Sequence, residues 1–97
     1  MRKTYLEKKF RCEIGKIQST LLKLGYTQFG NNFYKKTSRG RLHVKLDFVK
    51  KNSCKMTIHH DVGATPHYTI AFDLVPHRAW KNIEKELFLT YGTSFEL

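Results

Sequence analysis

Apolar and polar residues alternate strictly over three stretches between residues 41 and 74. In residues 41–50 the even positions from Leu42 to Phe48 are apolar, and residues 54–58 and 68–74 repeat this rule. A period of two is typical of a strand that buries one face and exposes the other. The pattern predicts three such strands. A fourth, near residues 32–37, is expected to join residues 41–50 through the Ser38-Arg39-Gly40 turn.

The alternation also constrains how residues 41–50 pair with residues 54–60. A three-residue loop over residues 51–53 keeps every even-numbered apolar residue on one face. It sets Phe48 opposite Met56 and Lys45 opposite His59. A two-residue loop would set Phe48 opposite Lys55 in the core, so we expect the longer loop.

Helical spacing appears at both ends of the chain. Near the N-terminus, spacings of four, four, three, four and three predict a helix over about residues 5–24. Thr4 and Glu7 resemble a capping box at its start, and Gly25 would end it. The apolar residues with this spacing are Leu6, Phe10, Ile14, Ile17, Leu21 and Leu24.

A second helix is predicted from Pro76, which suits a first turn, to Gly92. Its apolar face consists of Ala79, Trp80, Ile83, Leu87 and Tyr91. Since each helix has one apolar stripe and the sheet one apolar face, the expected fold is α+β. We predict a single domain, residues 1–97, with a four-stranded antiparallel sheet, two helices packed on one face and element order αββββα.

Positive charge is concentrated in the first part of the chain. The formal net charge is +10, made up of +12 in residues 1–55 and −2 in residues 56–97. With 40% hydrophobic and 13% aromatic residues, the composition argues against a disordered basic tail. A domain this small also has no room for the deep cleft of an elaborate cofactor enzyme, and no cofactor is expected.

No stretch of about 18 apolar residues is present, and the N-terminus lacks the apolar segment of a signal peptide. We therefore expect a cytoplasmic protein that does not enter membranes. Cys12 and Cys54 are far apart and form no C-x-x-C motif, which favours reduced thiols over a disulfide.

The polar face of the predicted sheet is the strongest functional signal. Alternation places Arg41, His43, Lys45, Lys55 and His59 on it, together with Lys35 or Lys36 and with Phe33 or Tyr34. Cations neutralise phosphates and a ring stacks on an unpaired base, so the pattern favours a non-catalytic protein that binds DNA or RNA. The candidate binding residues are Lys35, Lys36, Arg39, Arg41, Lys45, Lys50, Lys51, Lys55 and Tyr34, with Lys8 and Arg11 from the first helix.

Other functions stay open from the sequence. The cationic face could dock on an acidic protein surface, as an interaction module or inhibitor of viral or mobile-element type would. His43 and His59 could act as base and acid in a metal-independent ribonuclease. A homodimer is compatible with apolar residues left exposed near the C-terminus.

A zinc site is the remaining chemical possibility. Its ligands would be Cys54, His59, His60 and His67, but His59 and His60 point to opposite faces of a strand and no metal-binding spacing is present. No metal is therefore expected.

The predicted element order resembles that of double-stranded RNA-binding domains and of HicA-type mRNA interferases. The motifs of those families are not repeated here. The second helix begins Pro76-His77-Arg78-Ala79-Trp80-Lys81 instead of carrying a Lys-Lys-x-Ala-Lys pattern. The stretch after the first helix, Gly30-Asn31-Asn32-Phe33, contains no histidine. We therefore assign the chain to neither family.

Overall fold

The computed structural model describes residues 5–50, 53–62 and 74–92. Five strands and two helices lie within these ranges. In chain order they are β1 (Tyr5–Arg11), α1 (Ile14–Lys23), β2 (Thr27–Phe29), β3 (Asn32–Lys36), β4 (Gly40–Lys50), β5 (Ser53–Val62) and α2 (Val75–Tyr91).

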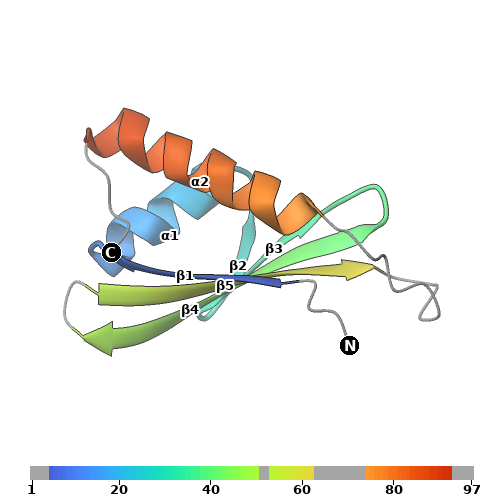
Figure 1. Ribbon diagram of the computed structural model, residues 1–97, viewed down its shortest axis with the longest axis horizontal. Coiled ribbons are helices and arrows are strands. Elements are labelled where there is room, and N and C mark those ends of the chain that lie inside the picture. The colour runs from blue at the N-terminus through green and yellow to red at the C-terminus, as the bar shows by residue number, and fades with distance from the viewer. Residues whose placement is uncertain (1–4, 51–52, 63–73, 93–97) are drawn as a thin grey trace.

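The strands form one antiparallel sheet in the spatial order β1-β5-β4-β3-β2. Both helices lie on the same side of this sheet, as Figure 1 shows. The predicted α+β class and the placement of the helices are confirmed. The strand number is not, since the described residues form five strands and the order is βαββββα. The resemblance in element order to the two RNA-related families is lost with it.

Residues 5–11 form an edge strand instead of the first half of a helix. β1 pairs with β5, with Leu6 opposite Ile58 and Phe10 opposite Cys54. A spacing of four residues puts side chains on one face of a strand as well as of a helix, so Leu6 and Phe10 fit both. Glu7, the glutamate of the expected capping box, lies within β1, and Thr4 is outside the described residues.

The helix that does form, α1, begins after Glu13, whose side chain makes no capping hydrogen bond. Its buried residues are Ile17, Thr20 and Leu21. The chain leaves the helix through Gly25, whose φ of 95° lies in the left-handed region that favours glycine.

The hairpin of β4 and β5 has the predicted parity but a different register. Phe48 lies opposite Cys54 and Lys45 opposite Thr57, two residues away from the expected partners. β4 ends at Lys50 and β5 begins at Ser53, with a register shift between Phe48 and Lys50. One extra residue in a bulge restores even pairing after the shorter connection. The prediction of a three-residue loop was therefore wrong.

The turn between β3 and β4 lies where the sequence predicts it. The Thr37 N–H donates to the Gly40 carbonyl at 2.9 Å, and the Gly40 N–H donates to the Thr37 hydroxyl at 3.0 Å. His60 lies 2.9 Å from the same hydroxyl and is buried, which ties the turn to β5. The strand predicted over residues 68–74 lies outside the described residues, apart from Leu74 at the start of α2.

Helix α2 agrees with its prediction at both ends. Pro76 lies in its first turn, and Gly92 ends it with a φ of 77°. The buried residues of this helix are Pro76, Ala79, Trp80, Ile83 and Leu87. No helix in the described ranges is long and apolar enough to cross a membrane.

The core fills the space between the helices and the facing side of the sheet, which we call the inner face. Ile58, Val44 and Phe33 lie side by side on three neighbouring strands and are fully buried. The Phe10 ring packs 5.8 Å from the Trp80 ring of α2. Cys12 and Cys54 are free and buried at the same layer. The opposite side of the sheet is called the outer face below.

Candidate nucleic-acid interface

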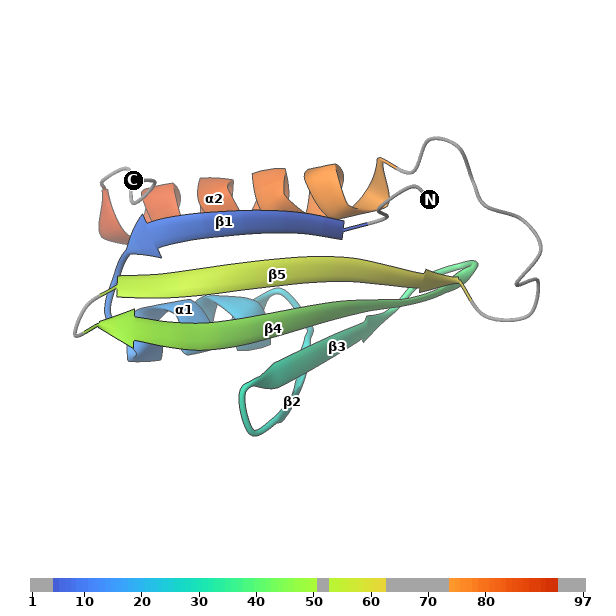
Figure 2. The same cartoon turned by 60° about the horizontal axis from the view of Figure 1, so that its bottom comes forward.

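Neither helix covers the outer face. In Figure 2, β5, β4 and β3 lie in front and α1 lies behind them. The register sets His43 of β4 between Tyr34 of β3 and His59 of β5, so all three side chains project from the outer face. These side chains therefore lie on a face of the sheet that neither described helix covers.

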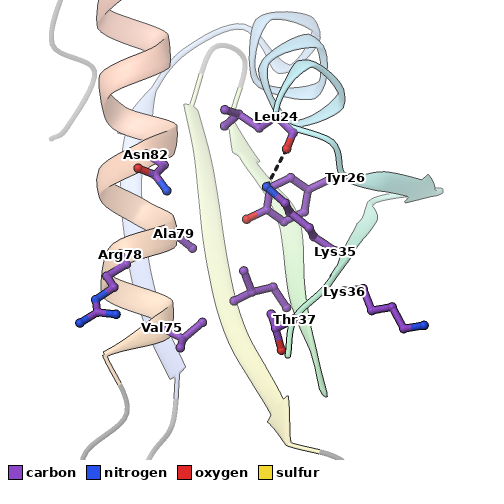
Figure 3. Close-up of a pocket in the computed structure, with 10 residues that line it drawn as sticks. Leu24, Tyr26, Lys35, Lys36, Thr37, Val75, Arg78, Ala79 and Asn82 are labelled. Carbon is purple, nitrogen blue, oxygen red and sulfur yellow. Dashed lines mark hydrogen bonds between the residues drawn. The ribbon is translucent and has the colours of Figure 1, made fainter. Parts of the chain in front are cut away.

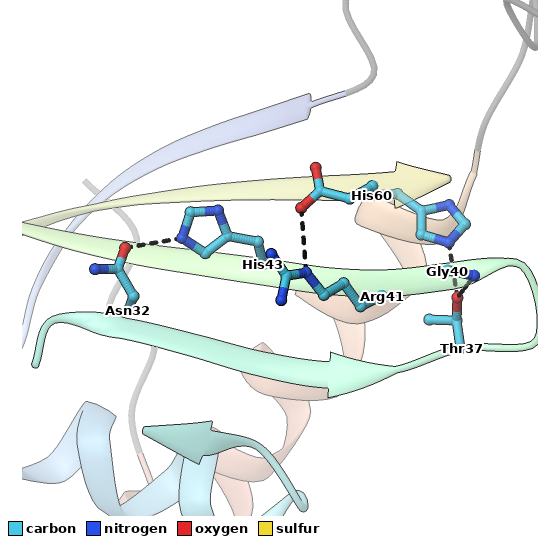
Figure 4. Close-up of polar contacts among 7 residues, drawn as sticks. Asn32, Thr37, Gly40, Arg41, His43 and His60 are labelled. Carbon is cyan, nitrogen blue, oxygen red and sulfur yellow. Dashed lines mark hydrogen bonds and ion pairs between the residues drawn. The ribbon is translucent and has the colours of Figure 1, made fainter. Parts of the chain in front are cut away.

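Four rings follow one another across the outer face, and we call them the ring row: Phe29, Tyr34, His43 and His59. Tyr34 and His43 stack with ring centroids 4.8 Å apart and planes 10° apart. His43 and His59 stack at 5.6 Å, and Phe29 meets Tyr34 edge-on at 5.9 Å. His43 Nε2 lies 2.8 Å from Asn32 Oδ1, which fixes the orientation of that imidazole (Figure 4).

Cations surround the ring row. The Arg41 guanidinium lies 4.5 Å from the centre of the Tyr34 ring, and its Nε lies 3.7 Å from a carboxylate oxygen of Asp61. Lys55 is partly offset by Glu7, 3.8 Å away. The register places six cations on the outer face: Lys9, Arg11, Lys36, Arg41, Lys45 and Lys55.

The electrostatics of this face act on His43. Partial burial lowers its pKa, and the nearby His59, Arg41 and Lys45 lower it further. Asp61 opposes these effects but does not cancel them. His43 is therefore held toward its neutral form, in which one ring nitrogen carries a proton and the other accepts.

A groove lies at one end of the ring row. It has a volume of about 490 Å³. The residues that line it are Thr27, Phe29, Tyr34, Lys36 and Arg41. All five project from the outer face by register, so the groove belongs to this face and not to the gap between helix and sheet.

Two lysines predicted for the interface lie on the inner side instead. Lys35 donates to the Leu24 carbonyl at 2.9 Å and lies 5.5 Å from the centre of the Tyr26 ring. Figure 3 shows Lys35 directed toward Leu24 and Lys36 directed away from it. The Lys8 ammonium lies 5.6 Å from the centre of the Trp80 ring. Strand alternation accounts for both, because Lys8 and Lys35 occupy inner-face positions.

A second, smaller cavity of about 190 Å³ lies on the inner side, next to Lys35 (Figure 3). Tyr26, Leu42 and Ala79 line it among others. Of the cations that line it, Lys35 already donates to the Leu24 carbonyl. Burial raises the pKa of Tyr26 to about 12. This cavity offers less for a charged ligand than the outer face does.

The first helix was expected to share in binding, but α1 lies on the inner side. Its Lys16 ammonium lies 5.0 Å from the centre of the Tyr91 ring, and Lys23 pairs with Glu86. Both lysines therefore connect α1 to α2. Among the other predicted residues, Arg11, Arg39 and Lys50 are exposed, and Lys51 lies outside the described residues.

The suggested zinc ligands do not come together. Cys54 and His60 are buried on the inner side, His59 is on the outer face, and His67 lies outside the described residues. Within the described part of the chain, no group of three or more His, Cys, Asp or Glu side chains could hold a metal ion. Three apolar residues toward the C-terminus bear on the homodimer considered from the sequence. Trp80 belongs to the core, and Phe95 and Leu97 lie outside the described residues.

The sequence predicts no strand before residue 32 and therefore gives Thr27 and Phe29 no place on this face. Asn32 lies in a predicted strand but has no predicted role. A signal was present. Gly30-Asn31 separates Phe29 from Asn32, and Gly-Asn is a common two-residue hairpin connection. Gly30 has a φ of 60°, as such a turn requires.

Comparison with known proteins gives no match, since no family model, no curated protein and no solved structure is significantly similar to the chain. Any function therefore has to be argued from the outer face itself.

Proposed function

We propose that the protein binds nucleic acid through the outer face of its sheet. The observation that carries this proposal is the combination, on one uncovered face, of the ring row with the six cations around it. Lysine and arginine neutralise phosphates and release counterions, while an exposed ring such as Phe29 can stack on a base. The excess of positive charge on the whole chain speeds the encounter with a polyanion.

The experiment compares lysines on the two sides of the protein. Lys45 and Lys55 lie on the outer face, whereas Lys81 and Lys85 lie exposed on α2. Binding of fluorescent oligonucleotides would be measured over a series of salt concentrations. The double variant of Lys45→Gln and Lys55→Gln is expected to lower the slope of log K against log salt by about one for each lysine.

The matched control is the double variant of Lys81→Gln and Lys85→Gln, which removes the same charge from the opposite side. It is expected to keep most of the wild-type affinity. Two results would overturn the proposal: no binding of any oligonucleotide at low salt, or equal losses in the two double variants. A complex with an acidic protein that blocks the oligonucleotide would instead favour a protein-docking function.

The geometry favours binding over RNA cleavage. A general base and a general acid in this reaction act on opposite sides of the scissile phosphate. His43 and His59 stack face to face at 5.6 Å, which leaves no room for a phosphate between the rings. The same oligonucleotide samples, run on a denaturing gel, would reveal cleavage. Cleavage lost in both His43→Ala and His59→Ala would replace the binding proposal with an enzymatic one.

A further inference from the structure

We infer that the groove beside Phe29 holds one unpaired base together with its phosphate, so that the ligand is a single-stranded nucleic acid. This inference rests on the proposed function and deepens it. It depends on three features of the residues that line the groove: an exposed ring, an arginine that lies over a second ring, and another cation opposite that arginine in the strand register.

The exposed ring is Phe29. It is 65% exposed, at the end of the short edge strand β2. A phenyl ring left in water gains free energy when a flat apolar surface covers it. Phe29 and Tyr34 form a T-shaped pair with ring planes 64° apart, so Tyr34 does not stack in parallel on Phe29. A nucleobase has the flat shape that such a ring face binds.

Polar as well as aromatic side chains line the groove. Arg41 lies over the Tyr34 ring, and a stacked guanidinium keeps its N–H donors in its own plane. Nε faces Asp61, which leaves the terminal N–H groups to meet a phosphate. Lys36 lies directly opposite Arg41 in the strand register. The two cations can therefore contact one phosphate that follows a base held by Phe29.

A duplex does not satisfy this arrangement. In a double helix each base face is covered by the next base, and only base edges and phosphates are open to a protein. A duplex could reach Lys36 and Arg41 but would leave Phe29 in water. A single strand supplies both the free base face and the phosphate, which is why the groove discriminates by strandedness.

The groove has space for such a unit. Its volume of about 490 Å³ lies within the range of sites that hold small organic ligands. From the groove, the outer face continues with Lys45 and Lys55 on β4 and β5. A strand anchored at Phe29 can therefore extend over further cations, each of which adds a phosphate contact.

The test measures binding of one sequence as a single strand and as a duplex. Wild-type protein is expected to prefer the single strand. Phe29→Ala should weaken single-strand binding by about tenfold and change duplex binding little. Phe29→Trp should restore the affinity, and its added indole fluorescence should be quenched by the single strand, since the native Trp80 is buried.

A lysine pair supplies the charge control. Lys36→Gln removes a groove cation, whereas Lys35→Gln removes the adjacent charge that is directed to Leu24. Only Lys36→Gln should weaken binding. Thermal unfolding would show whether Phe29→Ala folds. If it did not, the fluorescence quenching of Phe29→Trp and the comparison of the two lysine variants would still test the inference.

The outcomes separate this inference from the proposed function. Equal affinity for single strand and duplex, with no effect of Phe29→Ala on either, would overturn the single-strand inference and leave nucleic-acid binding standing. Failure of the wild-type protein to bind either form would overturn both. If Lys35→Gln lost as much affinity as Lys36→Gln, the groove would not be the place where the single strand binds.

Discussion

The two faces of the sheet are made by the same strands and differ in chemistry. On β5, Met56 and Ile58 are fully buried under the helices, while Thr57 and His59 between them face outward. The inner face gains stability from apolar burial. The outer face keeps rings and cations in water, where they contribute little to folding. One strand thus contributes to the core and to an uncovered surface at alternate positions.

The difference between the inner and outer faces is clearest for two pairs of adjacent lysines. Lys8 contacts Trp80 from the inner side, whereas Lys9 lies opposite Lys55 on the outer face. Lys35 donates to a backbone carbonyl, whereas Lys36 lines the groove. A count of positive charge treats the members of each pair as equal. Strand position gives one lysine of each pair a contact within the protein and leaves the other exposed on the outer face.

The largest expected effect comes from truncating one side of β5. Ile58→Ala removes a fully buried side chain and should lower the free energy of unfolding by about 2–5 kcal/mol. Thr57→Ala, next in the chain but on the outer face, should change it by about 0.5 kcal/mol or less. Denaturant unfolding of both variants measures the difference. Similar losses in the two would mean that the faces are not distinct.

Alkaline pH probes the inner face through a thiol. Burial raises the pKa of Cys54 to about 11 from its ordinary value of 9.0. The unfolded chain therefore loses this proton at lower pH than the folded chain, so stability falls as pH rises from about 9 to about 11. A difference of two pKa units corresponds to about 2–3 kcal/mol.

Cys54→Ala should remove this component, and unfolding curves between about pH 8 and pH 11 would show it. The variant is expected to be less stable near neutral pH, because a buried side chain becomes smaller. It should then lose less stability than the wild type as pH rises. Parallel curves for the two proteins would contradict the assigned burial of the thiol.

A smaller effect separates the lysines of β1. Lys8→Ala removes the contact with Trp80 and the packing of its aliphatic stem, and should cost about 0.5–1 kcal/mol of stability. Lys9→Ala should leave stability nearly unchanged and weaken oligonucleotide binding instead. Unfolding and binding measured on both variants form a crossed comparison. If Lys8→Ala weakened binding more than Lys9→Ala, the assignment of faces on β1 would be wrong.

The first helix shows why part of the fold escaped sequence analysis. Leu6, Phe10 and Ile14 are spaced by four, which is an even number and so fits one face of a strand as well as of a helix. Only spacings of three exclude a strand, and these begin at Ile14 and Ile17, inside the helix that forms. Residues 5–11 form a strand because they pair with β5, which lies far away in the sequence. A local spacing pattern contains no information about such a partner.

The candidate site was predictable to the extent that alternation defines it. Parity alone places Arg41, Lys45 and Lys55 on the outer face, and the register agrees. Parity could not choose between Lys35 and Lys36, because the start of β3 was not defined. Parity also could not predict the groove. Phe29 lines the groove because it lies in a three-residue strand, and that strand has no apolar pattern of its own.

The smallest expected effect lies on the outer face at His43. Desolvation lowers its pKa, and the neighbouring His59, Arg41 and Lys45 add to this against the opposing effect of Asp61. The unfolded chain then takes up the proton at higher pH than the folded chain. Stability should therefore fall as pH drops through the ordinary histidine value near 6.5 and level off below the pKa of folded His43.

His43→Gln removes this dependence while keeping an amide near Asn32. Unfolding free energies between about pH 7.5 and pH 5 would be compared for the variant and the wild type. The wild type should lose more stability on acidification, by a small margin because solvent reaches His43 and screens its neighbours. His77→Gln, on α2, controls for the loss of a histidine. A wild-type protein that became more stable toward pH 5 relative to His43→Gln would show that the outer face favours the protonated imidazole instead.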